Sequence, residues 1–409
     1  FAHAEAAMTA LLTFEHPADG ALSYYFRQHR ELGHADRGFV AEACYATLRR
    51  LRSLSARCPD DQPRKLLLAA MYCLRGWNQK QLAPILKDGD AEWLAVAKAA
   101  DTAAWPAAVR CDLPDWLYER LAARFPGDIE ALATALNRPA PLDLRVNPLK
   151  TSREAALRQL ASDHIAAAAS PWSPLGIRLE EKPALSKYPL FVDGSIEVQD
   201  EGSQLLGFLL EPKRGEMVVD FCAGAGGKTL LLGALMRNTG RLYAFDVSDK
   251  RLANLKPRLA RSGLSNVHPA RIEHERDQKI KRLAGKADRV LVDAPCSGLG
   301  TLRRNPDLKW RQNEQSIAEL TVKQASILDA ASTLVRPGGR LVYATCSLLA
   351  EENDAIVAAF SEKHPDFSLL LASTLLGKQG IACDGDVLRL LPHQHNTDGF
   401  FAAALERKA

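Results

Sequence analysis

Apolar positions recur every three or four residues along the first third of the chain. The clearest set is Phe39, Val40, Ala43, Cys44, Thr47, Leu48 and Leu51. This i, i+3, i+4 spacing predicts an amphipathic helix. The segment "PRKLLLAAMYCLRGW" predicts another, and the abundance of alanine with few β-branched runs favours helices throughout. Residues 1–130 are therefore predicted to form an all-α domain.

The pattern changes between residues 131 and 210. Prolines at 139, 141 and 148 interrupt any helix, since proline cannot continue one. "LDLRVN" alternates like a strand, and "SREAALRQLAS" predicts a short helix capped by Ser152. "FVDGSIEVQDEGSQLLGFLL" predicts a strand followed by a helix. The segment 131–210 is predicted to be a small α/β connector.

From residue 211 to 409, apolar strands alternate with helical segments of ten or more residues. "MVVDF", "GRLYAFDVS", "DRVLVDAPC" and "RLVYATCS" are predicted strands, and "EQSIAELTVKQASILDAASTLVRPGG" is predicted to be a long helix closed by Pro-Gly-Gly. Strand–helix alternation is typical of a parallel sheet covered by helices on both sides. This part is predicted to be a doubly wound, Rossmann-like α/β domain.

Composition narrows the class of protein without identifying it. The 409 residues are 47% apolar and 25% charged, and the net charge of +4 neither announces nor excludes a nucleic-acid partner. No apolar run approaches the ~20 residues that cross a bilayer, so no membrane partner is expected. The eight cysteines form no Cys-x-x-Cys pair. This argues against a zinc cluster or a disulfide framework and favours a reducing, cytoplasmic setting.

The glycine-rich stretch "DFCAGAGGKT", residues 220–229, predicts a nucleotide-binding turn. A phosphate-binding loop of the G-x-x-x-x-G-K-[ST] type is disfavoured because Cys222 stands where its first glycine belongs. In the alternative, a dinucleotide-type turn, an acidic residue about 20 positions later binds ribose hydroxyls. Asp246 lies 20 residues after Gly226 at the end of the next predicted strand. A turn used only for tight packing is the competing interpretation.

Three reactive side chains follow later strands. Asp293 ends one, Cys296 comes just after it, and Cys346 ends another. The carboxyl ends of parallel strands open onto one crevice, so these groups are expected to meet near the glycine loop. A thiol with a lowered pKa is a nucleophile. The alternative, two small buried apolar residues, is less natural for a pair at such positions.

These segments carry a family resemblance. "DFCAGAGGKT", "VDAPCSGLGTLRRNPDLKW" and "LVYATCSLLAEEN" resemble the signature segments of the bacterial Rsm/Nop/Sun family of RNA cytosine-5 methyltransferases. "APLDLRVN", "VQDEGSQL" and "TDGFFAA" are similar to its connector and last strand, over about 135–405 in all. The N-terminal part loosely resembles a NusB-like RNA-binding domain. The resemblance implies a class I methyltransferase sheet with a last antiparallel strand.

The resemblance also implies a chemistry. A thiolate that adds to C6 of cytosine makes C5 nucleophilic toward the methyl group of S-adenosylmethionine, and an acid near N3 stabilises the adduct. Cys346 is implied as nucleophile, Cys296 as the thiol that assists release, and Asp293 as the group near N3 and the methionine end of the cofactor. Asp246 is implied on the ribose. The cofactor loop is implied to comprise Cys222, Ala223, Gly224, Ala225, Gly226, Gly227 and Lys228.

Two positions depart from the family pattern. Ala225 stands where the family usually has proline, so the turn is less preset by a fixed φ. Backbone contacts to the cofactor are expected to survive this. The acidic residue after the third strand is also open among Glu273, Glu275 and Asp277, and Asp277 is the preferred choice for the adenine.

Basic residues indicate where RNA is expected to bind. The cluster near Cys296 is Arg303, Arg304, Lys309 and Arg311 with Trp310, a combination that suits phosphate contacts and base stacking. Arg145 and Asn147 are further candidates by resemblance. In both sets the competing role is structural. The helical set Arg49, Arg50, Arg52 and Arg57 is more simply a solvated helix face. His393 and His395 lack the partners that a metal site needs.

Together these observations predict a cytoplasmic, monomeric, S-adenosylmethionine-dependent RNA cytosine-5 methyltransferase, with 16S ribosomal RNA as the expected substrate and no metal. A tRNA methyltransferase is the alternative within the same chemistry. A non-catalytic RNA-binding assembly factor is the alternative from another class, and the two cysteines argue against it.

Overall fold

The computed structural model describes residues 1–58 and 60–409. It divides into two compact units. Unit 1 comprises Phe1–Pro139 and Thr301–Glu314, and unit 2 comprises Ala140–Gly300 and Gln315–Ala409. The second stretch of unit 1 is an excursion from the middle of unit 2, which the sequence pattern did not indicate. No helix in the described ranges is long and apolar enough to cross a membrane.

Unit 1 is helical in all its described regular elements. Its longer helices are α1 (Ala2–Leu11), α2 (Ala18–Gln28), α3 (His34–Arg49), α5 (Pro63–Ala69), α7 (Asp90–Ala99), α9 (Asp115–Arg124) and α10 (Ile129–Leu136). The apolar stripe predicted on α3 is buried at Val40, Cys44 and Leu48, against Met8 of α1 and Leu67 of α5. The short α17 (Leu308–Arg311) comes from the inserted stretch.

Unit 2 begins with a small antiparallel sheet. Its strand order is β2-β3-β1-β4, from β1 (Leu142–Val146), β2 (Ala167–Ala169), β3 (Gly176–Leu179) and β4 (Ile196–Val198). Helix α11 (Arg153–Ser162) packs on it, capped by the side chain of Ser152, which accepts a hydrogen bond from Ala155 N. The predicted strand 142–147 is thus the centre of this sheet.

The large sheet of unit 2 has the order β10-β12-β9-β8-β5-β6-β7, with β11 paired to β12. The strands β5 (Met217–Asp220), β6 (Arg241–Asp246), β7 (Val267–Arg271), β8 (Ala287–Asp293) and β9 (Val335–Thr345) are parallel. The strand β12 (Phe400–Arg407) runs antiparallel to β9 and to β10 (Phe367–Leu370), and β11 (Leu388–Leu390) also pairs with β12 antiparallel. The mostly parallel sheet and its antiparallel last strand confirm the predicted fold class.

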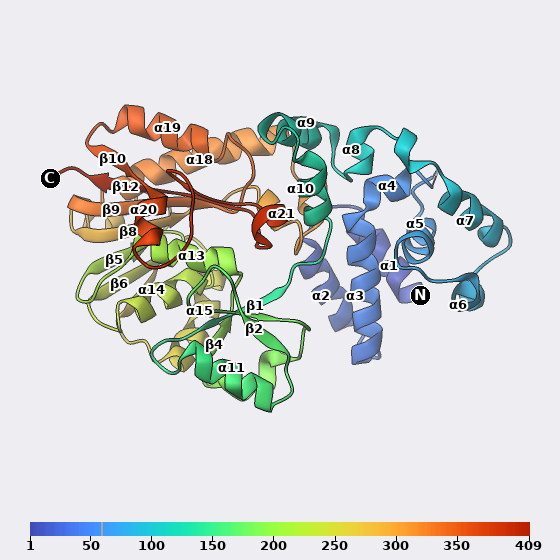
Figure 1. Ribbon diagram of the computed structural model, residues 1–409, viewed down its shortest axis with the longest axis horizontal. Helices are drawn as coiled ribbons and strands as arrows, with labels where there is room; N and C mark the ends of the chain where they lie inside the picture. The colour runs from blue at the N-terminus through green and yellow to red at the C-terminus, as the bar shows by residue number, and fades with distance from the viewer. Residues whose placement is uncertain (59) are drawn as a thin grey trace. The chain divides into compact units, whose positions relative to one another are not determined.

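Helices cover both faces of this sheet (Figure 1). One core joins Val219 and Val290 to α18 (Glu314–Ser332) and α19 (Asp354–Lys363). The other joins Val218 and Leu291 to α13 (Glu201–Leu210) and α14 (Gly227–Leu235). Neighbouring residues of one strand face opposite cores because strand side chains alternate. The remaining helix next to the site is α15 (Asp249–Ser262).

One boundary prediction was wrong. The long helix does not extend to Pro-Gly-Gly: α18 ends at Ser332, and strand β9 already begins at Val335. Val335 pairs with Ala287, and an irregularity of register near Arg289 accommodates the Pro-Gly-Gly segment. Long-range pairing with β8 overrides the local helix-stop signal here.

Candidate active site

The carboxyl ends of the parallel strands enclose a cavity of about 680 Å³. This size is ordinary for a small-molecule site. The glycine loop, Asp246 and Asp293 meet there, as their positions at strand ends predicted. The lining includes Cys222, Ala223, Gly224, Ala225, Gly227, Lys228, Asp246, Glu275, Asp293, Gln199, Ser203, Arg258 and Lys323.

The glycine loop turns sharply from β5 into α14. Gly226 has φ +84° and stands at the N-terminus of α14, and a Cβ at this position would lie 2.0 Å from Leu255 Cδ1. Arg258 NH1 donates to the carbonyl of Ala225 at 2.6 Å. An arginine on α15 therefore helps hold the turn at the position where the family usually has proline. Local sequence gives no signal for this role, because Arg258 lies 33 residues away.

Gly226→Ala is expected to destabilise the protein more than Gly224→Ala. Both glycines have positive φ, which costs a side-chain-bearing residue about 1–2 kcal/mol. A Cβ at Gly224 meets nothing within 4 Å, whereas one at Gly226 meets Leu255, and overpacking adds about 1–3 kcal/mol. Urea unfolding of the two variants checks this. Equal losses would show that Leu255 moves aside without cost.

Asp246 fixes the neighbouring edge of the cavity. Its side chain accepts hydrogen bonds from Gly224 N at 2.9 Å and Ser248 N at 2.7 Å. A carboxylate has about four acceptor positions, so two remain for other donors such as paired hydroxyl groups. Asp246 is only 5% exposed, and it lines the cavity. This arrangement suits the ribose contact predicted for it.

Asp293 forms an ion pair at the opposite side of the cavity. Lys228 Nζ donates to Asp293 Oδ2 at 2.5 Å, from α14 to the end of β8. Burial opposes the charged form of Lys228 and is the largest single effect. The charge of Asp293, the hydrogen bond to it, and smaller contributions from Cys346 and Asp220 together raise the pKa of Lys228. Lys228 also interacts electrostatically with Cys346.

The two predicted cysteines lie side by side. Cys296 Sγ and Cys346 Sγ are 3.4 Å apart. Gly300 N donates to the carbonyl of Cys346 at 2.8 Å, and a Cβ on Gly300 would lie 2.8 Å from that carbonyl and 2.2 Å from the carbonyl of Gly399. Only glycine allows this approach. The sequence motif Cys-Ser-Gly-Leu-Gly therefore serves to bring the two thiol loops together.

Contact with Cys346 affects the ionisation of Cys296. The hydrogen bond to Cys346, together with burial, raises the pKa of Cys296 well above its ordinary value. Cys296 consequently keeps its proton near neutral pH, and a protonated thiol is a poor nucleophile. The assignment of Cys346 as nucleophile and Cys296 as the thiol that assists release stays a prediction from the family resemblance. A third thiol, Cys222, lines the cavity, and burial raises its pKa well above the ordinary value.

The acidic residue that lines the cavity after β7 is Glu275 and not Asp277, the choice preferred from the sequence for the adenine. Asp277 caps the short α16 (Gln278–Lys281), accepting hydrogen bonds from Glu273 N and Lys279 N, and does not line the cavity. Glu275 does line it, and its Oε1 accepts a hydrogen bond from Ser326 Oγ at 2.6 Å. The structure therefore favours Glu275 over Asp277 as the cofactor contact. The sequence had left these residues open.

Several predicted RNA contacts are engaged within the protein. Lys309 is 1% exposed, and its Nζ donates to Arg49 O and Asn137 Oδ1, both at 2.8 Å. Trp310 Nε1 donates to Leu48 O. Arg303 is buried, and Arg304 is half-buried. These geometries support a structural role in unit 1 for Lys309 and do not support its contact with a phosphate.

The other predicted basic positions are also partnered. Arg145 is 3% exposed, and its NH1 donates to Gln199 Oε1 and to Gly227 O, which supports the glycine loop from β1. Asn147 Nδ2 donates to Gly194 O and Ser262 O. Of the N-terminal arginines, Arg50 pairs with Asp112. Each member of the predicted helical set donates hydrogen bonds within unit 1: Arg49, Arg50, Arg52 and Arg57.

The buried Lys309 is expected to make the stability of unit 1 depend on pH. Burial lowers the pKa of Lys309 to about 7, below its unfolded value of about 10.4. The unfolded chain then binds more protons between these values, so stability rises with pH by up to about 1.4 kcal/mol per unit. Urea unfolding is followed by tryptophan fluorescence for wild type and Lys309→Met. The free energy of unfolding of wild type should rise relative to that of Lys309→Met from pH 7 to 10. A pH-independent difference would contradict it.

Two protein-family models match this sequence. The sequence model of the 16S rRNA methyltransferase RsmB/F family matches residues 207–406. The model of the ferredoxin-like domain of RsmF/B-like methyltransferases matches residues 113–186. The second match extends from the end of unit 1 across the small sheet.

Curated relatives point the same way. Probable ribosomal RNA small subunit methyltransferase B of Synechocystis sp. is 39% identical over 298 residues, 72% of this chain and 66% of that protein. Ribosomal RNA small subunit methyltransferase B of Sodalis glossinidius is 38% identical over 292 residues, 71% of this chain and 65% of that protein. The matched part thus spans slightly less than two thirds of these relatives.

Solved structures extend the likeness. A methyltransferase homolog protein from Pyrococcus horikoshii is 31% identical, with a TM-score of 0.64, and the match covers 74% of this chain and 97% of that one. The crystal structure of PH0851 matches 99% of this chain and 97% of its own, with a TM-score of 0.81 and 27% identity. The Rossmann-like fold predicted from strand–helix alternation is confirmed by both.

Proposed function

Because this chain belongs to the RsmB/F family of methyltransferases, we propose that it transfers a methyl group from S-adenosylmethionine to C5 of a cytidine in RNA. The substrate is 16S ribosomal RNA, as the names of the curated relatives support. The observation that carries the chemistry is the pair of thiols 3.4 Å apart, of which Cys296 directly follows Pro295 in the cavity lining.

The residues present fit S-adenosylmethionine. The cavity of about 680 Å³ is large enough, and the acceptor positions left on Asp246 suit ribose hydroxyls. Lys228, Arg258 and Lys323 supply positive charge for a carboxylate. When bound, S-adenosylmethionine supplies a methyl group activated by a sulfonium. The cofactor loop comprises residues 222–228. The acidic residue proposed to contact the adenine is Glu275 and not Asp277.

The protein's own groups divide the reaction into easier steps. Cys346 adds through sulfur to C6, and the ring's C5–C6 electron pair becomes available at C5. Asp293, at the carboxyl end of β8, acts as the acid that stabilises the adduct at the cytosine N3. After C5 has been methylated, its proton leaves to a base, the C5–C6 double bond returns and the bond to Cys346 breaks. Cys296 assists this release, and Lys228 stabilises the thiolate of Cys346.

The remaining assignments belong to the same proposal. The protein acts as a monomer on RNA in the cytoplasm and needs no metal. Residues 1–130 form the RNA-binding domain, 131–210 the connector and 211–409 the methyltransferase domain. Among the predicted RNA contacts in the segment 301–314, Arg303 and Lys309 are buried and Arg304 is half-buried. Arg304 is therefore the preferred RNA contact of these three.

The test is methyl transfer with nucleoside analysis. The full chain is incubated with methyl-labelled S-adenosylmethionine and 16S rRNA, small ribosomal subunits or tRNA, and the RNA is digested. Label in 5-methylcytidine from 16S rRNA or the subunits is expected. Label in tRNA alone would establish the tRNA alternative. If no RNA is labelled although S-adenosylmethionine binds in calorimetry, the non-catalytic assembly factor is the better interpretation.

A further inference from the structure

A buried carboxylate lies between the two thiol loops. Glu352 is 0% exposed. Its Oε1 accepts hydrogen bonds from Ser297 N at 2.8 Å and Gln324 Nε2 at 3.0 Å. Its Oε2 accepts hydrogen bonds from Ser297 Oγ at 2.5 Å and from Ser347 Oγ. All four acceptor positions of the carboxylate are therefore filled.

The donors come from the residues that directly follow the thiols. Ser297 follows Cys296, Ser347 follows Cys346, and the two serine hydroxyls are 3.1 Å apart. Gln324 Nε2 also donates to the carbonyl of Pro295, directly before Cys296. One carboxylate thus holds both cysteine loops, and Gln324 of α18 holds the Cys296 loop to it from the side.

The backbone that carries Glu352 is held by further hydrogen bonds. Tyr343 OH of β9 donates to the carbonyl of Glu352 at 2.7 Å. The next residue, Asn353, accepts from Thr345 Oγ1 at 2.5 Å and donates from Nδ2 to Ser347 O at 2.9 Å. The segment 343–353 is therefore a closed loop of hydrogen bonds with Cys346 inside it. These bonds hold the backbone at Glu352 next to the Cys346 loop.

Stability alone gives no reason for such a group. Burying a carboxylate costs free energy, and well-packed apolar residues of similar volume are often as stable or more so. What a carboxylate offers is two oxygens in one plane, each able to accept two donors. That geometry suits the task of fixing two loops at a set separation.

We propose that Glu352 is a positioning residue that sets the separation and orientation of the Cys296 and Cys346 thiols. Its importance for turnover rests on the proposed methyl transfer, whereas its effect on thiol geometry does not. The two claims are therefore measured separately.

The variants follow from the donor set. Glu352→Ala removes all four acceptor positions and leaves two serine hydroxyls, a backbone N–H and an amide without this partner. Glu352→Gln keeps one oxygen for Ser297 N and Gln324, and its amide nitrogen donates to the two hydroxyls, which are able to accept. We expect Glu352→Gln to retain most of the thiol geometry and Glu352→Ala to lose it.

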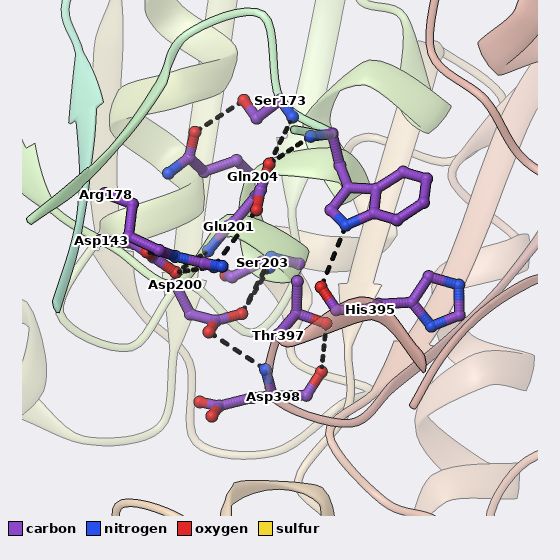
Figure 2. A network of polar contacts seen from close by, with 12 residues as sticks. Asp143, Ser173, Arg178, Asp200, Glu201, Ser203, Gln204, His395, Thr397 and Asp398 are labelled. Carbon is purple, nitrogen blue, oxygen red and sulfur yellow. Dashed lines mark hydrogen bonds and ion pairs between the residues drawn. The ribbon is translucent and has the colours of Figure 1, made fainter. Parts of the chain in front are cut away.

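Glu201 provides a matched control. It is also 0% exposed and accepts hydrogen bonds from two backbone N–H groups, Trp172 N and Ser173 N, and pairs with Arg178. Figure 2 shows Glu201 within the polar network around Asp143, Arg178 and Gln204. None of these partners lies in either cysteine loop. Glu201→Ala therefore tests whether loss of a buried carboxylate in general affects the thiols.

The first measurement is the rate of disulfide formation between Cys296 and Cys346 with diamide. One thiolate adds to the N=N bond of diamide, and the second thiol displaces it. The S–S bond forms as two electrons and two protons pass to the hydrazine product. Peptide mapping after alkylation isolates this pair from the other cysteines. Since a displacement of about 1 Å can cost about 10²-fold in a reaction of fixed groups, we expect Glu352→Ala to react about 10- to 100-fold more slowly.

The same variants are then assayed for kcat and KM with 16S rRNA and for binding of S-adenosylmethionine by calorimetry. We expect Glu352→Ala to lower kcat by about 10- to 100-fold with unchanged cofactor binding, and Glu352→Gln to recover most of it. Glu201→Ala, if folded in thermal unfolding, should match wild type in the disulfide rate. If wild type methylates no RNA, the proposed function fails, while the diamide rates still decide the role of Glu352.

A folded Glu352→Ala protein with the wild-type disulfide rate would overturn the proposal. Thermal unfolding establishes that the variant is folded. If it is not, the double variant Ser297→Ala with Ser347→Ala removes both hydroxyl donors and leaves the carboxylate in place. A slower disulfide reaction in that variant supports the proposal, and a wild-type rate both there and in Glu352→Gln overturns it.

Discussion

Replacing Cys346 with alanine is expected to abolish methyl transfer, and replacing Cys296 with alanine is expected to leave protein covalently joined to RNA. Without Cys346 no sulfur adds to C6, so C5 stays unreactive. Without Cys296 the adduct forms but its release is unassisted. The measurement is a denaturing gel of each variant mixed with 16S rRNA and S-adenosylmethionine, in which the trapped complex migrates more slowly than free protein.

The controls separate the two thiols from cysteines in general. The double variant should show no shifted band, and Cys383→Ala, which removes a thiol that belongs to neither cysteine loop, should behave as wild type. A shifted band in Cys346→Ala would mean that the roles of the two thiols are reversed. If Cys296→Ala traps tRNA but not 16S rRNA, the mechanism stands and the substrate is wrong.

The sheet and its reactive edge were predictable because they depend on local pattern. Apolar strands separated by long helical segments specify parallel pairing, and parallel strands end at one edge. Asp246, Asp293 and Cys346 each end or directly follow a strand, so their convergence follows without knowledge of tertiary contacts. The 3.4 Å approach of the thiols depends on Gly300 and Gly399, which sequence spacing alone does not relate.

The basic cluster was less predictable because a positive charge in sequence does not say where its partners lie. Lys309 finds Arg49 and Asn137, which are more than 170 residues away along the chain. Arg145 reaches Gly227 in the same manner. Buried cations require such distant partners, and only the folded chain brings them together. A charge cluster next to a catalytic motif is therefore weaker evidence for RNA contact than its position suggested.

Glu275 and Glu352 illustrate the same limit from the acidic side. Glu275 and Asp277 are two residues apart, and which one faces the cavity is decided by a turn after β7 that the pattern does not fix. Glu352 lies in a recognisable signature segment, but its partners Ser297 and Gln324 come from other elements. Sequence reasoning placed the two cysteines at strand ends and missed the carboxylate that accepts hydrogen bonds from both of their loops.

Asp293→Asn is expected to lower kcat by about 10²- to 10⁴-fold, the range that a positioned acid or base contributes. The amide keeps the shape of the side chain but is not an acid toward N3. It also removes the carboxyl oxygen that accepts the hydrogen bond from Lys228 and contributes to raising the pKa of Lys228. The measurement is kcat and KM with 16S rRNA, alongside calorimetric binding of S-adenosylmethionine. Asp288→Asn, at the opposite end of β8, is the matched control and should retain activity.

A second variant decides what Asp293 does. If the carboxyl acts on the cytosine, Asp293→Asn should lose kcat even when Lys228→Met already removes the ion pair, so the two losses partly add. If Asp293 serves only to hold Lys228, the double variant should be no slower than Lys228→Met alone. Wild-type kcat in Asp293→Asn would exclude both roles. In that case the aspartate at the end of β8 would be a partner of the buried lysine with no part in the reaction.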